Sequence, residues 1–155
     1  MAVLIGFDPS VINQSTVGNY TLGQELEFSG KTYLFVKLTD AVNATAGMVA
    51  EAGSATDGAI VTVDRAGGSS LGRIPMGVFV SPVTAGNYGC ILIRGLYASV
   101  KDAAGALNAV ALKVTTHATT DGDAAAATAY TDKIIGTVRV VSAAGVAAVY
   151  VQRGA

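Results

Sequence analysis

The chain has 155 residues, of which 51% are hydrophobic and only 14% are charged, and its formal net charge is −1 at pH 7. An ordinary soluble domain carries about 25% charged residues, so few charges are available here to cover a free surface, and we expect partners to cover part of it. Binding nucleic acid through its phosphates needs a cluster of Lys and Arg, and the sequence has none, so we expect no nucleic-acid partner. The length predicts one domain with a core of its own.

The sequence also bears on where the chain is found. No apolar run approaches the length of a membrane span, and residues 1–8 lack the basic region of a signal peptide. We therefore expect a soluble chain that is made in the cytoplasm and has no membrane partner. The single cysteine, Cys90, lies within an apolar run and is expected to be a small buried hydrophobe.

Residues 1–22 differ from the rest of the chain, because residues 13–21 are largely polar and the segment shows little apolar periodicity. They indicate an extended arm with a hydrophobic tip at residues 3–7. Two interpretations stay open: a frayed terminus, or an arm laid over a neighbouring subunit. Under the second, the predicted capsid or subunit contacts are Val3, Leu4, Ile5, Phe7, Pro9, Val11, Ile12 and Asn13.

The next segment has the pattern of a β-hairpin. Residues 24–28 and 31–37 are rich in strand formers, and Ser29-Gly30 between them suits a two-residue turn. Further strands are expected near 48–50, 59–63 and 75–80, with loops at 41–47 and 66–72.

Residues 86–95 combine a short apolar run with glycines on both sides. Cys90 to Ile93 is apolar without alternation, which predicts a strand covered on both faces. Gly86 and Gly89 suit a turn or bulge before this strand, and Gly95 is expected to end it.

An internal repeat is indicated at a spacing of 59 residues. Residues 77–95 and 136–154 share five positions, so each predicts a strand, a glycine-containing turn and a second strand. The shared positions are Gly77, Ala85, Gly86, Arg94 and Gly95, matched by Gly136, Ala144, Gly145, Arg153 and Gly154.

Between the two copies, strands are expected at 97–100 and 110–114, and residues 115–131 are expected to form a loop with some helix in the alanine run 124–127. Many short strands separated by glycine turns predict an all-β fold, namely a small β-sandwich or barrel-like domain. The expected organisation is an extended N-terminal arm (1–22) followed by a single β-domain (23–155).

Residues that could carry chemistry are sparse. His117, the only histidine, lies in a polar, Thr-rich stretch without a nucleophile or acid placed beside it by a recognisable motif. Asp121 and Asp123 alone make a weak calcium pattern, because the remaining oxygen ligands are missing. We therefore expect no enzyme, no metal site, no cofactor and no small-molecule substrate.

Three segments together resemble the capsid cement, or head decoration, proteins of tailed bacteriophages. They are the hairpin at 30–37 followed by Ala46-Gly47, then Pro75-Met76-Gly77-Val78 with the Ala-Gly-Asn-Tyr-Gly approach at 85–89 to the apolar strand, and last the closing hairpin from Ile135-Gly136 to Val151. The resemblance covers residues 22–154. Cys90 departs from the family pattern, in which a larger aromatic residue often follows the Tyr-Gly pair.

The resemblance implies a β-rich protein, commonly a homotrimer, on the exterior of the virion, where it clamps subunits of the major capsid protein. It implies no catalytic residues. The alternative is a receptor- or glycan-binding β-module of a phage fibre or a cell surface, which would use loops such as 64–73 and 115–131.

Overall fold

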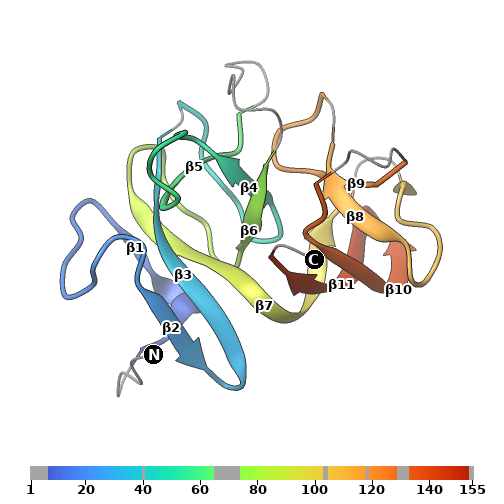
Figure 1. Ribbon diagram of the computed structural model, residues 1–155, viewed down its shortest axis with the longest axis horizontal. Coiled ribbons are helices and arrows are strands. Elements are labelled where there is room, and N and C mark those ends of the chain that lie inside the picture. The colour runs from blue at the N-terminus through green and yellow to red at the C-terminus, as the bar shows by residue number, and fades with distance from the viewer. Residues whose placement is uncertain are drawn as a thin grey trace.

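The computed structural model describes residues 7–39, 41–64, 74–102, 105–117, 119–128 and 133–153. Within these ranges the chain forms one short 3-10 helix and eleven strands and no α-helix (Figure 1). The elements are η1 (Pro9–Val11), β1 (Asn13–Gln14), β2 (Glu25–Phe28), β3 (Lys31–Leu38), β4 (Val49–Ala52), β5 (Ile60–Thr62), β6 (Pro75–Phe79), β7 (Tyr88–Lys101), β8 (Lys113–Thr116), β9 (Ala124–Ala126), β10 (Gly136–Ala143) and β11 (Val146–Gln152).

Five of the strands close into a small barrel, on the left of Figure 1. Strand β3 pairs with β5 in parallel, and the antiparallel pairs β5–β4, β4–β6, β6–β7 and β7–β3 complete the ring. The remaining strands extend from this barrel, with β2 beside β3 and with β11, β10, β8 and β9 following β7. The expectation of an all-β, barrel-like fold is confirmed.

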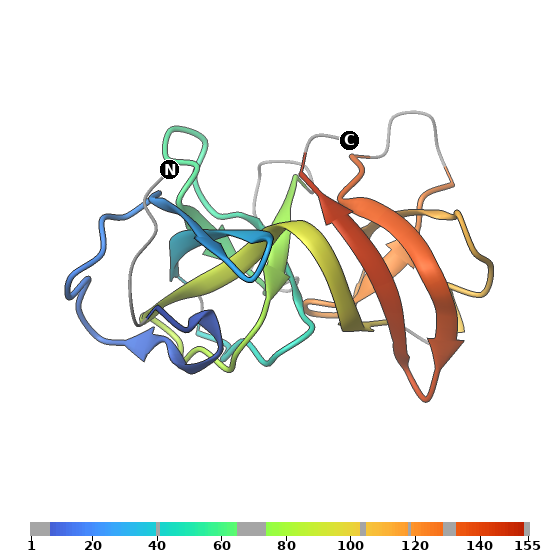
Figure 2. The same ribbon diagram turned by 90° about the horizontal axis from the view of Figure 1, so that it is seen from below.

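Strand β7 joins the two parts of the molecule. Its first half pairs with β3 and β6, and its second half pairs with β11 from Arg94 to Lys101. Figure 2 shows β7 passing from the barrel into the sheet that contains β11 and β10. The expectation that Gly95 ends the strand is wrong: at a φ of 130° this glycine lets the chain bend while the strand continues to Lys101.

The lack of alternation in residues 90–93 reflects burial of β7 on both faces, as predicted. Ile91 and Ile93 belong to the core inside the barrel, whereas Cys90 and Leu92 belong to a second core outside it. The barrel core also contains large side chains from β3 and β6, and the second core continues along β11 and β10. A strand that borders two cores needs apolar side chains at successive positions.

The predicted hairpin is formed by β2 and β3 with the register Phe28↔Lys31. Its turn residues Ser29 and Gly30 have φ values of 52° and 72°. Positive φ at both central residues defines the type I′ turn, whose twist matches that of antiparallel strands. The local sequence therefore sets the register of this pair.

The two segments with the repeated pattern each contain an antiparallel strand pair. In the first, Phe79 on β6 lies opposite Ile91, and in the second, Val138 on β10 lies opposite Val149. Adding the 59-residue spacing to the first pair gives 138 opposite 150, so the two registers differ by one residue. The connections differ too, since residues 80–87 form a long loop whereas Ala144-Gly145 is a tight turn.

The C-terminal third departs from the local propensities. Residues 124–126 form strand β9 against β8 rather than any helix, so the expected helical content is wrong there. The pairing of Ala124 with Thr116 and of Ala126 with Val114 outweighs the helix preference of alanine, which is small for so short a run. The loop expected at 66–72 lies outside the described residues. Among the residues described, no helix is long and apolar enough to cross a membrane.

Candidate interaction surfaces

The eight predicted contact residues of the N-terminal segment fall into three groups. Val3, Leu4 and Ile5 lie outside the described residues. Phe7, Pro9 and Ile12 are buried, with Phe7 and Ile12 only 3% and 4% exposed. Val11 is 73% exposed, and Asn13 is also exposed.

Phe7 is the centre of an aromatic cluster that includes side chains from the β-domain. Its ring lies edge-on to Tyr20, Phe28 and Tyr33, with centroid distances of 5.9, 6.1 and 6.2 Å. Tyr20 continues the cluster to Phe35 at 5.1 Å. Edge-to-face pairs of this kind add to the stabilisation from area burial alone. The beginning of the described chain is therefore held by packing against β2 and β3.

Polar contacts hold the next residues in place. The Asn13 Oδ1 accepts hydrogen bonds from the Thr84 backbone N–H at 3.1 Å and from Asn87 Nδ2 at 2.8 Å. The residue also pairs with Gly89 through β1. Before it, Asp8 caps η1, since its Oδ1 accepts from the Ser10 hydroxyl at 2.6 Å and from the Ser10 backbone N–H at 2.9 Å. These two bonds, the hydroxyl one first, lower the pKa of Asp8.

Contact of this segment with a capsid or a second subunit stays a prediction, but the hydrophobicity of its buried residues no longer supports that contact. The sequence suggested a segment without a core of its own, and that premise is wrong for Phe7, Pro9 and Ile12, which are buried within the chain. Of the described residues in the set, Val11 and Asn13 are the ones a partner could reach.

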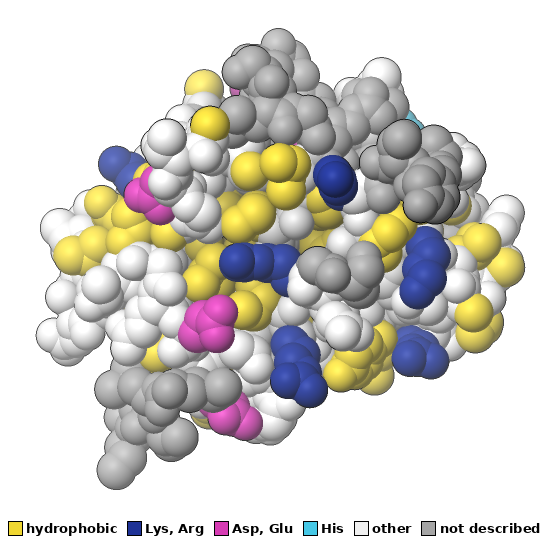
Figure 3. All heavy atoms as spheres, in the orientation of Figure 1, with side chains coloured by type: hydrophobic (Ala, Val, Ile, Leu, Met, Phe, Trp, Pro, Cys, Tyr) yellow, Lys and Arg dark blue, Asp and Glu magenta, His cyan; other side chains and the backbone are white. Residues whose placement is uncertain are grey.

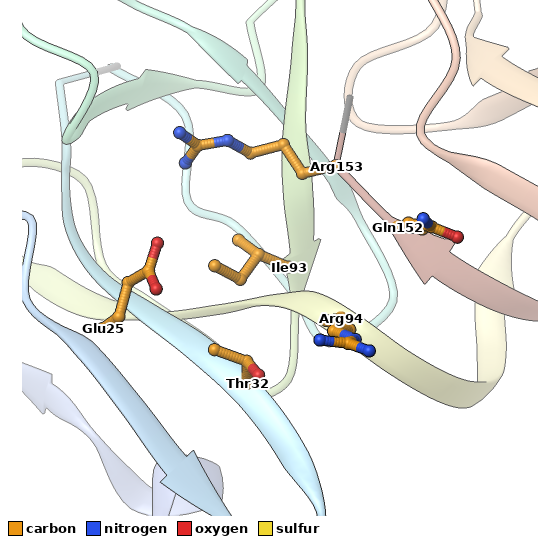
Figure 4. A pocket seen from close by; sticks show the side chains of 6 residues that line it. All are labelled: Glu25, Thr32, Ile93, Arg94, Gln152 and Arg153. Atoms are coloured by element: carbon orange, nitrogen blue, oxygen red, sulfur yellow. The ribbon is translucent and has the colours of Figure 1, made fainter. Parts of the chain in front are cut away.

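A second candidate surface is a hollow where β2, β3, β7 and the end of β11 meet (Figure 4). Its volume is about 430 Å³. The lining residues are Glu25, Thr32, Ile93, Arg94, Gln152 and Arg153. Sequence reasoning missed this site, because its residues come from three distant segments; the signal available was the repetition of Arg94-Gly95 as Arg153-Gly154.

The outer face of the sheet beside the hollow combines basic and apolar side chains. Leu96 and Val140 are 46% and 60% exposed, and Leu96 lies opposite Tyr150 in the β7–β11 register. Arg139 stacks over the Tyr150 ring, 5.6 Å from its centroid. Strands β7, β10 and β11 contain Arg94, Lys101 and Arg139 but no Asp or Glu.

The distribution of charge is visible in Figure 3. On the face of the molecule drawn there, Asp and Glu side chains lie in the left half. The right half, over β8 to β11, shows Lys, Arg and hydrophobic side chains. Such a face suits a partner surface with apolar and acidic groups.

His117 and Asp123, which the sequence offered as candidates for chemistry, lie in the segment between β8 and β9. His117 Nδ1 accepts the backbone N–H groups of Thr119 at 3.3 Å and Thr120 at 3.1 Å, which closes the turn before β9. Partial burial raises the pKa of Asp123, although the charges of Lys101 and His117 oppose that shift. Across the described ranges, no group of three or more His, Cys, Asp or Glu side chains is arranged to hold a metal ion.

The fold is similar to that of one solved structure, the N base of head fiber gp8.5 in bacteriophage phi29. The TM-score is 0.50 at 16% sequence identity, and the match covers 78% of this chain and 93% of that chain. At this identity the likeness shows a shared fold. No protein-family model and no curated protein sequence matches the chain.

Proposed function

We propose that the chain is a structural protein of a tailed-bacteriophage virion that binds the exterior of the assembled head and stabilises the lattice of the major capsid protein. The observation that carries the proposal is the likeness to the N base of a phage head fiber protein, which extends over 78% of the chain. The glycine motifs that resemble cement proteins support the same role.

The composition and the surface also support it. Charged residues make up 14% of the sequence, and several large apolar side chains are exposed on the described surface, among them Val11, Leu96, Val110 and Val140. Scattered single residues of this kind are common on protein surfaces, but a small number of charges among them favours association. The proposal includes no catalytic step.

The mechanism is linkage. A protein that binds the assembled, expanded lattice and not its dissociated subunits stabilises the lattice in proportion to ln(1 + [L]/Kd). We propose that it acts as a homotrimer, since three linked weak contacts at a threefold site give an avidity far above that of one contact.

The test is co-sedimentation of the purified protein with expanded empty heads of the encoding phage, with unexpanded proheads as the comparison. We expect saturable binding to expanded heads, with three copies, or a multiple of three, at each lattice site. Sedimentation equilibrium of the free protein should show a trimer. Binding to neither particle by a folded protein would refute the proposal.

The N-terminal contact needs a variant that leaves the fold intact. Deleting residues 1–22 would also remove Phe7 and Ile12 from the core, so the combined replacement of Val3, Leu4 and Ile5 by Ser is the sharper choice. Weaker head binding with an unchanged unfolding midpoint would support contact through these three residues.

A second candidate function follows from the likeness to the base of a head fiber: the chain would be a base that attaches a receptor- or glycan-binding fibre to the head. Such a base binds heads without stabilising them. Heating heads with and without bound protein separates the two roles, because only a cement protein raises the temperature at which heads lose their DNA or disassemble.

A further inference from the structure

Two exposed arginine residues, Arg94 and Arg153, line the hollow between β2–β3 and β11. Arg94 lies in the register of two strand pairs, opposite Thr32 on one side and Gln152 on the other. Arg153 follows β11, and its backbone N–H donates to the Ile93 carbonyl at 3.0 Å. Backbone hydrogen bonds therefore fix the main-chain positions of Arg94 and Arg153, and their side chains lie on either side of Ile93 (Figure 4).

The two cations lack a counter-ion within the described part of the chain. Neither Arg94 nor Arg153 has an ion-pair partner among the residues that the structure describes, although Glu25 lines the same hollow. In Figure 4 the Arg153 side chain passes above Ile93 and points away from Arg94, and the Glu25 carboxylate stands apart from both guanidinium groups. Unpaired guanidinium groups at the rim of a hollow are a common arrangement for binding carboxylates.

We propose that this hollow binds an acidic side chain presented by the surface of a partner protein. Its floor, Ile93, is apolar and 8% exposed, so it packs against the methylene groups of a glutamate. On binding, the exposed Arg94 and Arg153 side chains turn toward the carboxylate from either side of Ile93. The Thr32 hydroxyl and the Gln152 amide, which also line the hollow, offer further donors. Glu25 opposes the incoming charge and limits the affinity for small anions.

The neighbouring face indicates that the occupant is part of a protein. Two positions from the Arg94↔Gln152 pair in the β7–β11 register lies the Leu96↔Tyr150 pair, and Val140 on β10 is 60% exposed. A free anion gains nothing from these apolar groups, whereas an acidic residue within an apolar protein surface makes both contacts at once. The few cations of this face also argue against a nucleic-acid backbone.

The positions shared by residues 77–95 and 136–154 bear directly on this hollow. Arg94 and Arg153 occupy corresponding positions, 59 residues apart, and the fold brings both to one hollow. The inference rests in part on the proposed function, since a head-binding protein would meet such a residue on the capsid, but the hollow can be tested without any particle.

The test uses two capped pentapeptides, one with a central glutamate between leucines and one with glutamine in its place, titrated into the ¹⁵N-labelled full chain. We expect the glutamate peptide to shift the amide signals of Ile93, Arg94 and Arg153. The glutamine peptide should bind about tenfold more weakly, which corresponds to the loss of a charge-assisted hydrogen bond.

Variants assign the effect to the hollow. R94Q and R153Q should each weaken binding of the glutamate peptide by about tenfold, and E25Q should strengthen it by about twofold, because a like charge is removed. K113Q is the matched control, since Lys113 is an exposed cation on β8 outside the hollow, and it should leave binding unchanged. The proposal is overturned if no signals shift, or if K113Q weakens binding as much as R94Q.

Inorganic phosphate serves as a third ligand in the same titration. If phosphate shifts the same signals more strongly than the peptide, the hollow takes a phosphate-bearing ligand and the proposal is wrong. Head binding separates the two inferences: heads bound equally by wild type and R94Q, with no peptide binding, would refute the hollow and leave the proposed function standing. Peptide binding without head binding would do the reverse.

Discussion

Replacing Phe7 with Ala tests whether the N-terminal segment belongs to the core or is free for a partner. Phe7 is 3% exposed and makes edge contacts with three aromatic rings. Truncation of a buried Phe to Ala costs about 3 to 5 kcal/mol, and we take the lower value of about 3 kcal/mol because Phe28, one of the rings around Phe7, is itself 41% exposed. With a urea slope of about 2 kcal/mol per M, the unfolding midpoint should fall by about 1.5 M.

The assay is urea unfolding followed by far-ultraviolet circular dichroism. Val11→Ala is the control, because that side chain is 73% exposed and should change stability by less than about 0.5 kcal/mol. Equal midpoints for Phe7→Ala and wild type would refute the reasoning. They would mean that the segment contributes little to the folded domain and is available to a neighbour.

Three further predictions concern the fold. Gly77→Ala should lower the urea midpoint, because the new Cβ would lie 2.7 Å from the Leu92 carbonyl oxygen on β7. Gly58→Ala should be near neutral, because its Cβ would lie 3.9 Å from the Met76 methyl group, an ordinary contact distance. Burial raises the pKa of the Cys90 thiol from 9.0 to about 12, so the native state retains a proton that the unfolded state loses. Stability should therefore fall as pH rises from 9 toward 12, less steeply in Cys90→Ala, in urea titrations across that window. Ser29→Asn should increase the free energy of unfolding by about 0.5 kcal/mol, because asparagine adopts positive φ more readily in a type I′ turn with Gly30. The measurement is a small rise in the melting temperature.

Local patterns were sufficient to predict the parts of the fold that local physics decides. The β2–β3 hairpin followed from the Ser29-Gly30 turn, and the burial of β7 on both faces followed from the apolar run at Cys90–Ile93. The strand at Ala124–Ala126 was not predictable in this way, because its pairing with β8 is a tertiary interaction that overrides the preference of alanine.

The behaviour of Gly95 shows a different limit. In a sequence, a glycine after an apolar run indicates the end of a strand. Here Gly95 instead allows the bend by which β7 leaves the barrel and continues alongside β11. The distinction depends on whether a partner strand is present on the far side, and β11 lies more than 50 residues later in the chain. The hollow depends on the same bend, since it forms around Arg94 of β7, which pairs with Thr32 near the start of β3 and with Gln152 at the end of β11.

The two candidate surfaces lie at different points along β7, and this bears on how one copy could link two others. The N-terminal segment joins β7 at Tyr88, where β1 pairs, and the hollow includes Arg94. Six residues of strand separate these positions, which corresponds to about 20 Å. A protein that clamps a lattice needs at least two contacts that do not overlap, either on one chain or on the linked copies of an oligomer. This chain offers two such contacts. One is the exposed surface around Val11 and the other is the hollow lined by Arg94 and Arg153, and the continuous strand β7 holds them apart.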